Sequence, residues 1–138
     1  MKKLLLTFIF AALCGTVCKA QTSTSGYDWT KVIDALIKVE SNGNPKARNG
    51  KCLGCLQITP ICVKQINILL GRKAYTLEDR LDVNKSREMF VVYQEHYNKK
   101  NSIEKAIRSW KGGRGYTKQG TERYYQKVMR EYKKGDSK

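Results

Sequence analysis

A single carboxylate, Glu40, ends a strongly apolar helical pattern and is followed at once by helix-stopping residues, Gly43, Asn44 and Pro45. Glu40 falls on the edge of an apolar stripe at helical spacing, formed by Val32, Ile33, Leu36, Ile37 and Val39. Burial there disfavours the charged form, which raises the pKa of the carboxyl group and keeps a proton available near neutral pH. The position predicts a general acid, although a solvated Glu at a helix end gives the same local pattern.

Cysteines are the other residues here that could do chemistry, in the spacing C-x2-C-x6-C: Cys52, Cys55 and Cys62. A zinc site needs a fourth ligand, and the one histidine, His96, lies far away in a helical pattern, so we expect no metal site. In an oxidising compartment Cys52 could pair with Cys55 or Cys62 and leave one thiol over. Alternatively, Cys55 and Cys62 are small core residues, and the sequence does not decide between the two.

The elements that must position these residues all have helical patterns. Caps, breakers and apolar periodicity predict helices over residues 28–41, 60–70, 82–99, 102–110 and 121–132, with a short turn opening at residues 76–79. No segment has a convincing strand pattern. We therefore expect an all-α, or nearly all-α, domain of about five to six helices.

Residues 1–20 have the pattern of a secretory signal peptide. A basic start and an apolar run over residues 4–13, too short to span a bilayer as a helix, precede a suitable cleavage site after Ala20. A lipoprotein is disfavoured, because neither Cys14 nor Cys18 follows a small residue. We expect export to the periplasm or out of the cell.

The rest of the chain divides simply. We expect residues 21–27 to be a flexible lead-in, residues 28–133 to form one domain and residues 134–138 to be a basic tail. The chain carries 27 Lys and Arg against 12 Asp and Glu, a net charge of +15 at pH 7. This excess favours polyanions, and export selects cell-wall polymers and lipid headgroups over nucleic acid.

Four stretches resemble, in order, motifs of the catalytic domain of soluble-lytic-transglycosylase-type lytic transglycosylases, in the lysozyme superfamily. Residues 40–45 (ESNGNP) look like the family's E-S-x-x-N-P motif, and residues 54–60 (GCLQITP) are similar to its G-L-M-Q-(I/L)-x-P loop. Residues 106–113 (AIRSWKGG) stand where the family has A-x-x-A-Y-N-x-G, and residues 121–128 (TERYYQKV) look like T-x-x-Y-V-x-x-V. The resemblance covers residues 29–132.

The third motif departs from the family, because Trp110 replaces a tyrosine and Lys111 an asparagine in a stretch that borders the family's active site. This departure concerns substrate positioning rather than the acid. Trp110 could stack on a sugar ring or be a plain core aromatic. Lys111 could meet the peptide or lactyl carboxylates of the substrate.

The resemblance implies a lysozyme-like fold around a cleft and a peptidoglycan lytic transglycosylase without metal or cofactor. Glu40 would protonate the oxygen between N-acetylmuramic acid and N-acetylglucosamine, then accept the muramoyl C6 hydroxyl proton as the 1,6-anhydro ring closes. The usual two-carboxylate hydrolysis needs a second acid, and none offers itself. Asp34 lies about 120° around the same helix, whereas Asp79 and Asp82 lie in a separate capping region.

The resemblance also assigns roles around the acid. Ser41 and Tyr124 would form hydrogen bonds near Glu40, and Gln57 would bind the sugar. Each has a structural alternative: Ser41 as a helix cap, Gln57 as a loop stabiliser and Tyr124 as a half-buried core residue.

Three other functions stay open at this point. A goose-type lysozyme would hydrolyse the same bond, and a catalytically silent, basic protein could bind wall or help assemble an envelope-spanning machine. A nucleic-acid-binding helical protein would explain the charge but neither the export signal nor the ordered motifs. We expect a monomer whose partner is the peptidoglycan glycan strand.

Overall fold

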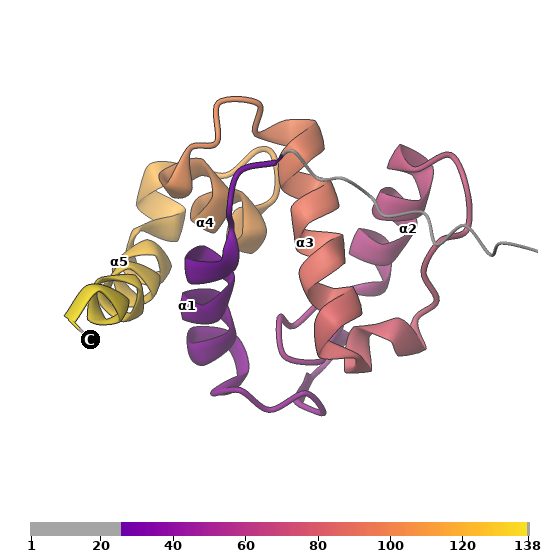
Figure 1. Cartoon of the computed structure of the whole chain (residues 1–138), viewed down its shortest axis with the longest axis horizontal. Helices are drawn as coiled ribbons and strands as arrows, with labels where there is room; N and C mark the ends of the chain where they lie inside the picture. The colour runs from indigo at the N-terminus through magenta and orange to yellow at the C-terminus, as the bar shows by residue number, and fades with distance from the viewer. Residues whose placement is uncertain (1–25, 138) are drawn as a thin grey trace, which may run out of the picture.

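Five α-helices make up most of the computed structural model, which describes residues 26–137 (Figure 1). They are α1 (Thr30–Ser41), α2 (Pro60–Leu69), α3 (Val83–Tyr97), α4 (Ile103–Gly112) and α5 (Lys118–Lys134). Two short antiparallel strands, β1 (Arg48–Asn49) and β2 (Cys52–Leu53), and two 3-10 turns, η1 (Glu78–Leu81) and η2 (Gly135–Ser137), complete this part. The prediction of a nearly all-α fold is confirmed, and the predicted signal peptide lies outside the described residues.

The core is built where α1, α3, α4 and α5 meet. Figure 1 shows α1 lying between α5 and α3. The side chains of Leu36, Phe90, Ile107 and Val128, one from each of these helices, are fully buried, as is Leu56 from the loop after β2. Burying each such side chain stabilises the fold by roughly 1.5–3 kcal/mol. The apolar stripe predicted for α1 therefore faces the core and fixes the direction in which this helix ends.

Most helix starts lie where the sequence predicts them. The Thr59 hydroxyl caps α2 by accepting the backbone N–H of Cys62, and Ser102 caps α4 by accepting that of Lys105. The Asp82 carboxylate caps α3 in the same way. At α1 the predicted cap is wrong, because the helix begins at Thr30 and its N-cap residue is Trp29, which makes no side-chain cap. Asp28 lies one residue further upstream, and its carboxylate accepts the N–H of Thr30 at 2.9 Å.

The predicted start of α5 at Thr121 is wrong. This helix begins at Lys118, because Thr117 is the cap and its hydroxyl accepts the N–H of Gly120 at 3.0 Å. Gly120 reads as a breaker in the sequence, but it lies in the first turn, where this bond holds it. Thr121 is buried in that turn, and its hydroxyl donates to the carbonyl oxygen of Thr117 at 2.7 Å.

Other helix ends shift by about two residues. Helix α3 stops at Tyr97, and α4 continues past Trp110 to Gly112 before Gly113 turns the chain with φ +71°. Of the predicted tail, residues 134–138, Lys134 ends α5 and residues 135–137 form η2, where Asp136 is ion-paired with Lys31.

The loop between α1 and α2 folds back tightly on η1. A Cβ atom at Gly54, where φ is +82°, would lie 1.7 Å from the carbonyl oxygen of Arg80. The buried guanidinium of Arg80 donates hydrogen bonds to the carbonyl oxygens of Lys51 and Ile58, both at 3.1 Å. The Arg80 side chain thus stabilises the conformation of this loop, which lines the cleft described below.

Cys52, Cys55 and Cys62 are free thiols in the described structure. Cys55 is fully buried and Cys62 packs against the core, in agreement with the second of the two interpretations of the sequence. None of the helices among residues 26–137 has the length and apolar character that crossing a membrane requires.

Candidate active site

A cleft of about 380 Å³ brings together side chains from four helices and two loops. The lining residues include Glu40 of α1, Gln57 and Thr59 of the loop before α2, Cys62 and Gln65 of α2, Tyr93 and Tyr97 of α3, Ser109, Trp110 and Lys111 of α4, and Arg114 of the α4–α5 loop. Its walls mix aromatic rings with a few polar groups. Such a lining is typical of sites that bind organic ligands.

Glu40 occupies the last turn of α1, half-buried on the cleft wall. Burial raises the pKa of its carboxyl group, while a hydrogen bond from Tyr124 and the positive charge of Lys111 act in the opposite direction without cancelling the effect. The direction agrees with the sequence prediction. Burial thus favours the protonated carboxyl group of Glu40, whereas Tyr124 and Lys111 stabilise its carboxylate once the proton has left.

Tyr124 of α5 is the hydrogen-bonding partner of Glu40. Its hydroxyl donates to Glu40 Oε1 at 2.5 Å. Burial and the neighbouring carboxylate both raise the pKa of the Tyr124 hydroxyl, so it stays protonated and remains a donor. Lys111 Nζ lies 5.3 Å from the centre of the Tyr124 ring. The structure thus joins Glu40, Tyr124 and Lys111, which the sequence brought together only through separate motifs.

Glu40 is the sole carboxylate that lines the cleft in the part of the chain that the structure describes. Asp34 is ion-paired with Arg87, Asp79 forms a 2.7 Å ion pair with Lys85, and Asp82 caps α3. The carboxylates weighed as a second acid are therefore engaged elsewhere. Over residues 26–137 there is also no cluster of three or more His, Cys, Asp or Glu side chains that could hold a metal ion.

Gln57 lines the cleft, but its amide group also holds its own loop. Nε2 donates to the carbonyl oxygens of Gly54 at 2.9 Å and Ala47 at 3.1 Å. The backbone at Gln57 has φ +51°, a conformation that a non-glycine residue adopts when its surroundings fix it. The loop-stabilising role is present in the geometry. Sugar binding would fall to Oε1, and it stays a prediction.

Ser41 is placed differently from the expectation. Its hydroxyl lies within hydrogen-bonding distance of the carbonyl oxygens of Cys55, at 2.8 Å, and Ile37, at 3.1 Å, and it does not bond to Glu40. Nor does it line the cleft. Ser41 instead fastens the end of α1 to the loop that carries Gln57.

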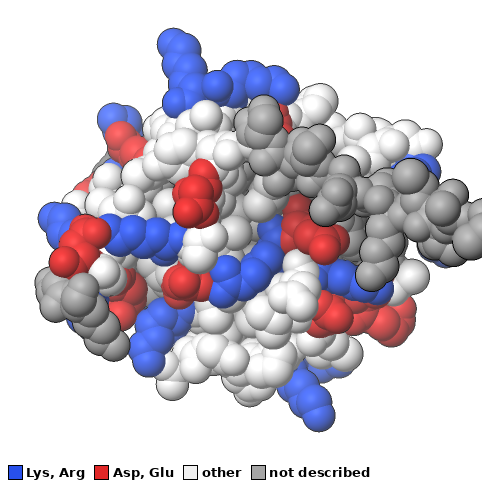
Figure 2. All heavy atoms as spheres, viewed as in Figure 1, with Lys and Arg blue, Asp and Glu red and all other residues white. Residues whose placement is uncertain are grey.

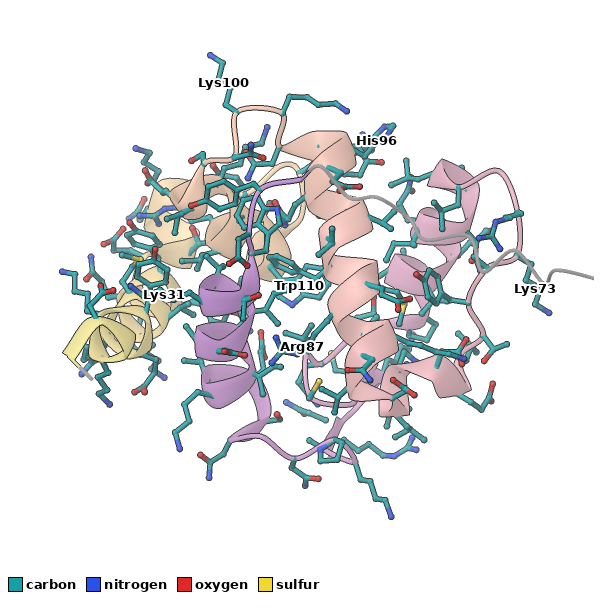
Figure 3. The ribbon with its side chains drawn as sticks, viewed as in Figure 1. Lys31, Lys73, Arg87, His96, Lys100 and Trp110 are labelled. Atoms are coloured by element: carbon teal, nitrogen blue, oxygen red, sulfur yellow. The ribbon has the colours of Figure 1, made fainter. Side chains whose placement is uncertain are left out.

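Trp110 has the contacts expected of a core aromatic. Its indole N–H donates to the carbonyl oxygen of Leu56 at 3.2 Å, and its ring meets Phe90 edge-on with centres 4.9 Å apart. Figure 3 shows Trp110 near the middle of the molecule, between α1 and α3. The residue is half-buried and also borders the cleft. Trp110 is therefore held in place as part of the cleft wall. Stacking of a sugar on its ring stays a prediction.

The sequence analysis did not propose the cleft residues Gln65, Tyr97 and Arg114 as site residues. Arg114 has its guanidinium carbon 4.9 Å from the centre of the Tyr97 ring, and Gln65 Nε2 donates to the Tyr97 hydroxyl at 2.9 Å. Arg114 stands in the run Gly-Gly-Arg-Gly, which signals only a helix break. The one available signal was a basic residue in a glycine-rich turn directly after the third motif.

The distribution of surface charge indicates the function of the protein less clearly than the cleft does. Figure 2 shows Lys and Arg side chains spread over one face and interspersed with Asp and Glu, rather than gathered in one continuous patch. Figure 3 places His96 near one end of α3, and its side chain is exposed.

Comparison with models of known protein families gives a match. A family model described as "Transglycosylase SLT domain" matches residues 18–133. The matched range includes every residue of the cleft wall. No curated protein and no solved structure gives a significant match to the chain.

Proposed function

The chain belongs to the transglycosylase SLT domain family, and from this premise we propose that it is an exported lytic transglycosylase of peptidoglycan. The substrate is the glycan strand, and the bond is the β-1,4 link between N-acetylmuramic acid and N-acetylglucosamine. One observation carries the proposal. A single half-buried carboxyl group with a raised pKa lines the cleft, and it accepts a hydrogen bond from a tyrosine that stays protonated.

In the first step Glu40 acts as the acid. Its carboxyl proton passes to the glycosidic oxygen, the bond from that oxygen to the muramoyl C1 breaks, and N-acetylglucosamine leaves with a free hydroxyl. The acetamido group of the muramoyl sugar stabilises the positive charge that develops at C1. Burial supports this step, because it favours the protonated form of Glu40.

In the second step Glu40 acts as the base. Its carboxylate accepts the proton of the muramoyl C6 hydroxyl while the C6 oxygen bonds to C1, which forms the 1,6-anhydro sugar and restores the acid. The Tyr124 hydroxyl and the Lys111 charge both stabilise the carboxylate that the first step leaves, so this form persists until the C6 hydroxyl is in position. A pKa set between opposing effects serves a group that must be acid and then base.

Product analysis separates this reaction from hydrolysis by a lysozyme-like enzyme. Purified cell-wall sacculi are digested with the protein, and the fragments are analysed by mass spectrometry. Ends that lack one water relative to reducing sugars are expected. Reducing ends without anhydro sugars would identify the hydrolase and rule out the transglycosylase.

A pair of carboxylate variants tests the role of Glu40. Removing a general acid costs roughly 10²–10⁴-fold in rate, so Glu40→Gln should release fragments at least about 100-fold more slowly. Asp34→Asn is the matched control, since Asp34 lies on the same helix outside the cleft and forms an exposed ion pair. Equal rates for Glu40→Gln and the parent protein would favour a silent wall-binding or assembly protein.

A further inference from the structure

Two cations line the cleft without an acidic partner. Lys111 and Arg114 both border it, and neither forms an ion pair with any residue in the range 26–137. Glu40, the one acid on the wall, enters the proposed reaction protonated. The cleft therefore offers positive charge that the protein itself does not neutralise.

Arg114 is held in place by a chain of contacts across three elements. Its guanidinium lies over the Tyr97 ring of α3, and the Tyr97 hydroxyl accepts a hydrogen bond from Gln65 of α2. Stacking occupies one face of the guanidinium and leaves the N–H groups at its edge free to bind. The side chain of Arg114 is exposed, so this contact orients a fork of donors that a ligand in the cleft can reach.

The two cations stand at different distances from the reacting group. Lys111 lies over the Tyr124 ring and acts electrostatically on Glu40, whereas Arg114 belongs to the Tyr97 side of the cleft. The turn between them is constrained. Gly113 has φ +71°, and a Cβ atom at Gly112 would lie 2.8 Å from Cβ of Tyr116. The backbone that carries the two side chains is thus constrained.

We propose that Arg114, together with Lys111, binds a carboxylate carried by the muramoyl sugar of the substrate. The inference rests on the proposed function, because the muramoyl C1 is then the atom that reacts beside Glu40. A guanidinium fork matches the two oxygens of a carboxylate and binds them with charge-assisted hydrogen bonds. The uncharged parts of the glycan offer no such group.

Two sources supply this carboxylate on the same sugar. In peptide-free strands the lactyl group attached to C3 ends in a free carboxylate. In peptide-bearing strands that group is amide-linked, and the carboxylates lie further out along the stem peptide. Experiments must therefore compare substrates that differ only in the charge at one of these places.

The test uses Arg114→Gln and two matched pairs of defined glycan strands. One pair carries stem peptides with free carboxylates or with carboxamides, and the other is peptide-free with a lactyl carboxylate or a lactyl amide. Loss of a bidentate, charge-assisted contact should raise KM roughly tenfold or more for the charged member of one pair relative to its neutral member, with kcat little changed. The pair that responds identifies the source.

A charge control and a binding measurement sharpen the result. Arg130→Gln removes one positive charge from the exposed surface of α5, outside the cleft. The KM values of this variant for both pairs of strands should equal those of the parent protein. The same four strands are titrated against Glu40→Gln with and without Arg114→Gln, so that binding is measured without turnover. This arm stays informative even if the products show hydrolysis.

The outcomes are distinct. A selective loss of affinity for charged strands supports the proposal. An equal effect of Arg114→Gln on the charged and neutral members of both pairs, or no effect on either, overturns it. A result in which Arg130→Gln matches Arg114→Gln also overturns it, because the preference would then come from net charge alone.

Discussion

The Tyr124 hydroxyl donates a 2.5 Å hydrogen bond to Glu40 Oε1 across 84 residues of sequence. The bond joins the last turn of α1 to α5, and it lies beside the cleft. It lowers the pKa of Glu40 against the larger effect of burial. The reactivity of the single acid is therefore set by contacts between helices.

Removing this hydroxyl should change the pH dependence of catalysis. Tyr124→Phe deletes a hydrogen bond that favours the carboxylate, so the pKa of Glu40 should rise further and the alkaline limb of kcat/KM should move to higher pH. The carboxylate left by the first step loses a stabilising hydrogen bond, so we expect kcat to fall about tenfold. The measurement is fragment release from sacculi between pH 4 and 9.

Tyr125→Phe is the matched control for that variant. Tyr125 is the next residue of α5, also half-buried, and its ring packs under Arg108 rather than facing Glu40. The alkaline limb of kcat/KM for Tyr125→Phe should coincide with that of the parent protein. Identical profiles for Tyr124→Phe and the parent would show that the hydrogen bond has no part in setting the pKa of Glu40.

Glu40→Gln should stabilise the fold at neutral pH. Burial raises the pKa of Glu40 in the folded state, so this group favours folding below its unfolded pKa, and that contribution is lost as the pH rises through the folded value. The free energy of unfolding of Glu40→Gln relative to the parent should therefore increase between pH 4 and pH 8. Urea denaturation at both pH values measures it, and a constant or shrinking difference contradicts it.

Gly54 should tolerate no side chain. In Gly54→Ala the new Cβ would meet the backbone of Arg80 at a positive φ, so we expect a loss of ~3 kcal/mol or more in the free energy of unfolding. Gly50→Ala is the control, because Gly50 also has a positive φ of +56° but faces open space. It should lose only ~1–2 kcal/mol. Equal losses in chemical denaturation would mean that the close approach to Arg80 is unimportant.

Arg108 should be a main support of the α4–α5 junction. Its guanidinium is 3% exposed and donates to the carbonyl oxygen of Lys118 at 2.9 Å and to Glu122 at 2.7 Å. Arg108→Met removes the charge-assisted hydrogen bonds of a buried side chain, and we expect a loss of ~2–3 kcal/mol in the free energy of unfolding.

The control for Arg108 is Arg123→Gln, an exposed position on α5 whose change should stay within ~0.5 kcal/mol. Thermal unfolding followed by circular dichroism compares the two variants. A similar small shift for both would show that Arg108 behaves as a surface charge despite its burial.

Much of the fold could be predicted because its signals are local. Thr59 with Pro60, and Ser102, mark helix starts through bonds within their own first turns. The start of α5 could not be placed, because Gly120 reads as a breaker and only the cap at Thr117 shows otherwise. Likewise, Ser41 follows the acid in the motif, but the packing of its loop turns its hydroxyl to Cys55.

The sequence alone determined that one carboxylate would end an apolar helix, since helix periodicity and breakers depend on neighbours along the chain. Only the tertiary structure decided what surrounds that carboxylate. Tyr124 reaches Glu40, and Arg114 stacks on Tyr97, through the packing of helices far apart in sequence. Burial and hydrogen bonding shift a pKa through contacts in space, and those contacts exist only once the helices have packed together.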